Sequence, residues 1–137
     1  MGTYGPARAV RISLLLMVTL ILGSCEDGTP EVLTSQRVVS PDFAYDAVIE
    51  EVHNGLGLGA GAIYSEIHVV PHAQNVMDHG GPSNSVVFYL ALGGDHDVRT
   101  TAKWRSATSL IIAYDARLGT PMKRPPRSPV AISYVPN

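Results

Sequence analysis

The sequence is poor in the residues that carry several common kinds of chemistry. Its 137 residues include one cysteine, Cys25, and one tryptophan, Trp104. One cysteine cannot form a disulfide within its own chain, and it excludes a zinc site built on several thiolates. No serine lies in the G-x-S-x-G pattern of many hydrolases, and no Gly-Lys-Ser/Thr sequence indicates a phosphate-binding P-loop. We therefore expect no cofactor, and no motif indicates a common enzyme class.

Charge is also scarce. Charged residues make up 16% of the chain, and the formal net charge is −2. No basic face dominates, so we expect no nucleic-acid partner. The signs are unevenly distributed, because Arg8 and Arg11 precede an apolar run whereas no acidic residue occurs before Glu26. A basic start of this kind is typical of an export signal.

A long hydrophobic run is missing as well. The longest, residues 12–22, has 11 residues. As a helix it would be about 17 Å long, well short of the ~30 Å hydrocarbon core of a bilayer. A transmembrane anchor is therefore the weaker interpretation. A basic start, a short apolar core and small residues after it predict a secretory signal peptide, which we expect to be helical, over residues 1–24.

The end of this run carries a more specific pattern. Leu22, Gly23, Ser24 and Cys25 stand in sequence directly after the apolar core. They resemble the lipobox of bacterial lipoproteins. The resemblance implies cleavage before Cys25, a diacylglyceryl group on its thiol, and a location in the cell envelope on the exported side of a membrane, inner or outer. Acylation would also remove the reactivity of a lone exported thiol.

The remaining chain is long enough for one domain. Without Arg8 and Arg11, eight basic residues remain against twelve acidic residues, which gives no electrostatic attraction to anionic lipid. Residues 25–36 begin with turn and linker residue types and predict a tether. Residues 37–137 predict an antiparallel β domain.

Alternating apolar residues indicate strands throughout this domain. The clearest case places Val98, Thr100, Ala102 and Trp104 on one face, opposite charged and polar residues. No window after the signal carries a capped helical stripe. We expect an all-β fold, a small antiparallel sheet or sandwich-like domain of six or seven strands. The expected strands cover residues 45–53, 63–70, 85–92, 97–105, 109–114 and 129–135, with one more possible after Arg37.

Two long connections interrupt the strands, residues 54–62 and 71–84, and their roles stay open. The first is rich in glycine but is followed by a strand pattern, whereas a dinucleotide-binding loop needs a helix there. The second follows His68 and holds His72, Asp78 and His79. On a strand, His68 and His72 would lie roughly 13 Å apart, too far to hold one ion. A site would need His72 to fold back toward Asp78 and His79.

Adjacent acidic residues offer a further candidate pair. Glu50 and Glu51 are neighbours in an expected strand, so their side chains point to opposite faces. We therefore exclude them as a catalytic carboxylate pair, and expect each to be an exposed strand residue or the partner of an arginine.

A turn sequence gives a second resemblance. Ser40-Pro41-Asp42, followed by Tyr45, Ala47 and Val48, resembles the S-P-D-G-x-Y-x-A-V entry to a hairpin in propeller blades and in short bacterial envelope proteins. The later Trp104, Leu110, Ile112 and Tyr114 fit the same short proteins. The motif occurs once, so a propeller is disfavoured. Phe43 stands where the pattern has glycine and resists a positive φ, which leaves the turn geometry open.

Together these patterns predict a lipid-anchored envelope protein with a non-enzymatic binding or structural role. Its partners would be the membrane, through the lipid, and an envelope protein or polymer. One alternative is a metal-binding protein or hydrolase that uses His72, Asp78 and His79. Another is an envelope-polymer binding module, which would display an exposed aromatic patch from Phe43, Tyr64 or Tyr89.

Overall fold

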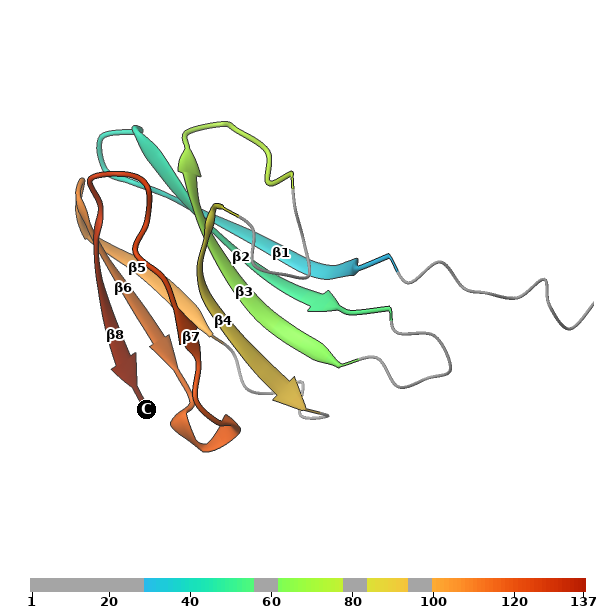
Figure 1. Cartoon of the computed structure of the whole chain (residues 1–137). Helices are drawn as coiled ribbons and strands as arrows, with labels where there is room; N and C mark the ends of the chain where they lie inside the picture. The colour runs from blue at the N-terminus through green and yellow to red at the C-terminus, as the bar shows by residue number, and fades with distance from the viewer. Residues whose placement is uncertain (1–28, 56–61, 78–83, 94–99) are drawn as a thin grey trace, which may run out of the picture.

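The chain forms two β-sheets packed face to face (Figure 1). The computed structural model describes residues 29–55, 62–77, 84–93 and 100–137. The five-stranded sheet has the order β1-β2-β3-β4-β7, and the three-stranded sheet has the order β5-β6-β8. A 3-10 helix, Ala116–Leu118, follows β6. The strands are β1 (Glu31–Val39), β2 (Tyr45–His53), β3 (Ile63–Pro71), β4 (Val86–Gly93), β5 (Thr101–Ser106), β6 (Ser109–Tyr114), β7 (Met122–Lys123) and β8 (Ala131–Pro136).

Apolar side chains from both sheets fill the space between them. Ala47 and Ile49 of β2 face this core, and Leu110 and Ile112 of β6 meet them from the other sheet. Trp104 of β5 is 8% exposed, as the alternation around it predicts. The core therefore collects the inward-facing positions of each strand, as expected for a sandwich.

The outer face of the five-stranded sheet is buried too. Residues 46–50 of β2 and residues 65–70 of β3 are buried without interruption. Since successive side chains of a strand point to opposite faces, continuous burial means that both faces are covered. Polar and charged residues of this outer face, among them Asp46, Glu50, Glu66 and His68, are therefore buried.

The structure confirms the predicted all-β class, and its described residues contain eight strands. Strand β1 begins at Glu31, inside the range predicted as a tether, so the domain starts before the predicted boundary at Arg37. The side chains of β1 are almost all exposed, and an exposed edge strand leaves no apolar alternation to detect.

One strand pair departs from the expected antiparallel arrangement. Strands β6 and β8 pair in parallel. Between them the chain passes through β7, which belongs to the other sheet, and this crossover returns β8 in the same direction as β6.

The β1–β2 turn shows how the chain accommodates Phe43. This residue has φ of +58°, the left-handed conformation that favours glycine. The hydroxyl of Ser40 donates to Asp42 Oδ1 at 2.8 Å, and the Tyr45 N–H donates to Ser40 Oγ at 3.0 Å. These side-chain bonds hold the turn, and the Phe43 side chain is 67% exposed.

Several predictions concern residues outside the described ranges. These are the signal peptide over residues 1–24, Leu22, Gly23, Ser24 and Cys25 of the lipobox pattern, and Asp78 and His79. In the described part of the chain, no helix has the length and apolar character needed to span a membrane. The N-terminal end of β1 and the β1–β2 turn lie at opposite ends of the sandwich (Figure 1).

Candidate functional site

Two glutamates and a histidine meet on the outer face of the five-stranded sheet. Glu50 of β2 and Glu66 of β3 are direct cross-strand partners, and His68 lies two residues after Glu66 on the same face. His68 Nε2 lies 3.4 Å from Glu66 Oε2 and 3.8 Å from Glu50 Oε2. One imidazole nitrogen therefore faces two carboxyl groups, an arrangement set by strand register.

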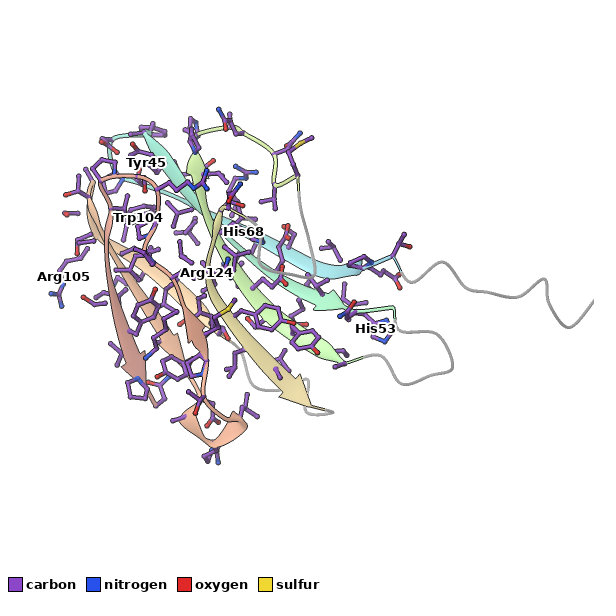
Figure 2. All side chains as sticks on the ribbon, viewed as in Figure 1. Tyr45, His53, His68, Trp104, Arg105 and Arg124 are labelled. Carbon is purple, nitrogen blue, oxygen red and sulfur yellow. The ribbon has the colours of Figure 1, made fainter. Side chains whose placement is uncertain are left out.

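Two serines extend this acid–histidine cluster, which we define as Glu50, Glu66 and His68. Ser85, directly before β4, is hydrogen-bonded to His68 Nδ1 at 2.9 Å. The hydroxyl of Ser35 in β1 donates to Glu50 Oε1 at 3.1 Å. Four segments that are distant in the sequence thus position the polar groups. The side chains of Glu66 and His68 are fully buried. His68 is labelled in Figure 2.

An open groove adjoins the cluster at Glu50. Its volume is about 490 Å³, within the range of small-molecule sites. Residues 75–77, after β3, form one wall, and β1 and β2 form the other. The groove is lined by Val32, Ser35, Arg37, Val48, Glu50, Asn75, Val76 and Met77.

The charge of Arg37 in this groove is already balanced. Arg37 Nη1 lies 2.5 Å from Asp46 Oδ2, and Nη2 donates to the Gln74 carbonyl oxygen at 2.9 Å. Asp46 also meets His72 Nδ1, at 2.8 Å from Oδ1, and accepts the Ala73 N–H. Burial by itself raises the pKa of Asp46, but these hydrogen bonds outweigh it and the pKa is lowered. Asp46 is therefore an anion that neutralises Arg37.

The cluster contains two carboxyl groups and one imidazole. Buried carboxylates are costly unless cations or hydrogen bonds compensate them. Glu50 is the member of the cluster that lines the groove. The groove therefore brings one acidic side chain of the cluster next to the apolar side chains of Val32, Val48, Val76 and Met77.

Of the three residues in the alternative metal-binding hypothesis, the structure describes only His72. His72 is bonded to Asp46, and its ring meets Phe43 edge-on with centroids 5.7 Å apart. Asp78 and His79 lie outside the described residues. In residues 29–55, 62–77, 84–93 and 100–137, no three His, Cys, Asp or Glu side chains are grouped closely enough to hold a metal ion.

The prediction for the adjacent glutamates was right about geometry and wrong about exposure. Glu50 and Glu51 do lie on opposite faces. Glu50 lines the groove on the outer face, whereas Glu51 lines an inter-sheet cavity with Thr34, Ser65 and Thr100. Glu50 is not an exposed strand residue, since it is 4% exposed. The signal that could have revealed the cluster is the i, i+2 spacing of Glu66 and His68 on a strand followed by a long connection.

The aromatic residues named for the alternative binding module do not all lie together, and Phe43 is the exposed one. Tyr64 and Tyr89 stack with centroids 4.6 Å apart and are half-buried, whereas Phe43 lies at the β1–β2 turn. Burial, and next the neighbouring Tyr64, raise the pKa of Tyr89.

Comparisons with protein-family models, with curated proteins and with solved structures found no match.

Proposed function

We propose that this chain is a lipid-anchored envelope protein whose domain binds a ligand carrying a cationic group. The ligand would place that group beside Glu50 and rest its apolar part in the groove between β1, β2 and residues 75–77. The observation that carries the proposal is the buried Glu50 carboxyl group bordering a 490 Å³ groove. A primary amine on an aliphatic chain, such as a lysine side chain, has the matching chemistry.

Three features support binding rather than catalysis. The groove combines apolar side chains with polar ones that could orient a ligand, as binding sites commonly do. Arg37 is neutralised by Asp46, and the other ionisable residue that lines the groove is the acidic Glu50. The Ser85–His68 pair does not line the groove, so a ligand in the groove would contact Glu50 and not this pair.

The location follows from the N-terminal pattern. We propose that residues 1–24 direct export and that Cys25 carries the lipid, because the run of 11 apolar residues is short and ends in Leu22-Gly23-Ser24-Cys25. More than one acyl chain is needed for stable anchoring, and a diacylglyceryl group supplies two. The anchor would then lie at the N-terminal end of β1, with the β1–β2 turn farthest from it.

A comparison of two probes tests the binding role. The full chain in phosphatidylcholine nanodiscs is titrated calorimetrically with hexylamine and with hexanol, and empty nanodiscs provide the blank. The two probes share the apolar chain and differ in charge. We expect saturable binding of hexylamine that is at least about tenfold tighter than that of hexanol, as for one charged hydrogen bond. Equal affinities, or no binding of hexylamine, would contradict the proposal.

A further inference from the structure

A further pocket lies at the other edge of the five-stranded sheet, where β7 and the proline-rich segment after it meet β8. Its volume is about 360 Å³, and its lining includes Lys123, Arg124, Pro125, Pro126, Ile132 and Tyr134. Strand β1, which borders the Glu50 groove, is the opposite edge strand of the same sheet. The two sites are therefore separate and stand on independent observations.

Hydrogen bonds and ring contacts fix the walls of this pocket. The Arg124 N–H donates to the Val87 carbonyl oxygen at 2.9 Å, and the Tyr134 hydroxyl donates to the same oxygen at 3.0 Å. The Tyr134 ring also stacks on Phe88, with centroids 6.1 Å apart. Pro125 and Pro126 restrict the backbone that follows Arg124. A wall fixed in this way loses little entropy when a ligand binds.

The cations at this pocket differ from Arg37 and Arg117, which pair with the carboxylates of Asp46 and Asp115. Lys123 instead places Nζ over the Tyr114 and Tyr134 rings, 5.2 and 5.0 Å from their centroids. Within the described ranges, neither Lys123 nor Arg124 has a carboxylate partner. Two adjacent positive charges thus border a pocket with apolar walls, in a chain whose net charge is −2.

We propose that this pocket binds a small amphiphilic anion, with a carboxylate or phosphate head and an apolar body. The Arg124 guanidinium, marked in Figure 2, presents a fork of donors that matches either head group. Lys123 adds a second positive charge. The apolar body contacts Pro125, Pro126 and Ile132, which gives the site a preference over simple inorganic anions.

Three probes separate the contributions of charge and apolar contact. The full chain in phosphatidylcholine nanodiscs is titrated with 4-phenylbutyrate, with 4-phenylbutanol and with inorganic phosphate, and empty nanodiscs provide the blank. We expect 4-phenylbutyrate to bind at least about tenfold more tightly than either other probe. Its affinity falls as salt rises, because the charge contribution is screened. A neutral probe that binds equally well would overturn the anion site, and phosphate binding equally well would overturn the amphiphile.

Variants locate the site. Arg124→Gln should weaken 4-phenylbutyrate binding about tenfold, whereas Arg124→Lys, which keeps the charge, should weaken it less. Arg105→Gln, which removes an exposed cation from β5, is the matched control and should leave the affinity unchanged. Circular dichroism checks that each variant is folded. The proposal is wrong if Arg124→Gln and Arg105→Gln bind the probe alike. If Arg124→Gln does not fold, loss of salt dependence in Lys123→Gln provides the same test.

Discussion

The indole Nε1 of Trp104 donates a hydrogen bond to the Val38 carbonyl oxygen at 2.8 Å. The two residues are far apart in the sequence and lie on β5 and β1, at the edges of different sheets. The bond therefore joins the two sheets at the side where β1 ends. Trp104 also packs in the core, so one side chain contributes both a polar and an apolar link between the sheets.

Substitutions of Trp104 separate these two contributions. Trp104→Ala removes the ring and should lower the free energy of unfolding by about 3–5 kcal/mol. Trp104→Phe keeps most of the apolar contact but loses the donor to Val38, and should cost about 1–2 kcal/mol. Urea unfolding followed by circular dichroism measures both. Equal losses for the two variants would mean that the hydrogen bond, not the ring, dominates.

Asp46 should make stability depend on pH. Its pKa in the folded chain is lower than the ordinary value of 3.8, because hydrogen bonds from His72, Arg37 and Ala73 favour the ionised form. Ionised Asp46 therefore stabilises the folded state fully above pH 3.8, and this contribution is lost as the pH falls through the lower, folded pKa. Asp46→Asn should be less stable than the parent near pH 7, and the difference should shrink below pH 3.8. Urea midpoints at several pH values measure it, and a constant difference would contradict the assignment.

Phe43 should carry backbone strain. Its φ of +58° disfavours any side chain, and the ring gains only an edge contact with His72. Comparing Phe43→Gly with Phe43→Ala isolates the backbone, since both variants lose the ring. We expect the glycine variant to be more stable by about 1 kcal/mol, because glycine adopts this conformation without strain. An alanine variant of equal or greater stability in urea unfolding would show that the turn is not strained.

The sequence predicts the parts of this fold that depend on apolar alternation. Trp104 and its neighbours on β5 follow the pattern that a half-buried strand requires, and the structure buries Trp104 as expected. The sequence does not predict strand β1, because almost all of its side chains are exposed and they therefore show no apolar alternation. The parallel β6–β8 pair depends on a crossover between the two sheets. Local sequence patterns do not predict such a crossover.

The acid–histidine cluster could be predicted only in part. Strand periodicity correctly predicts that the side chains of Glu66 and His68 lie on the face opposite that of Ile67. It cannot show that the chain after β3 turns back over this face, and a strand with one polar face normally exposes it to water. The groove beside the buried Glu50 depends on residues 75–77, which lie against β1 and β2.

The proposed lipid anchor has a simple chemical test. Cys25→Ser removes the thiol that would be acylated, so the variant should take up no lipid and should accumulate as unprocessed precursor. Metabolic labelling with a fatty acid, followed by gel electrophoresis, measures both effects in a bacterial host. Absence of label on the unaltered chain, or equal labelling of the variant, would contradict the anchor.

The central claim is that Glu50 recognises a cationic group, and the chain offers a matched pair to test it. Glu50 and Glu51 are adjacent, chemically identical and on opposite faces of β2, with only Glu50 in the groove. The measurement is the dissociation constant of hexylamine for the full chain, for Glu50→Gln and for Glu51→Gln. We predict that Glu50→Gln weakens binding at least about tenfold, whereas Glu51→Gln changes it less than about twofold. Equal affinities for the two folded variants would contradict the account.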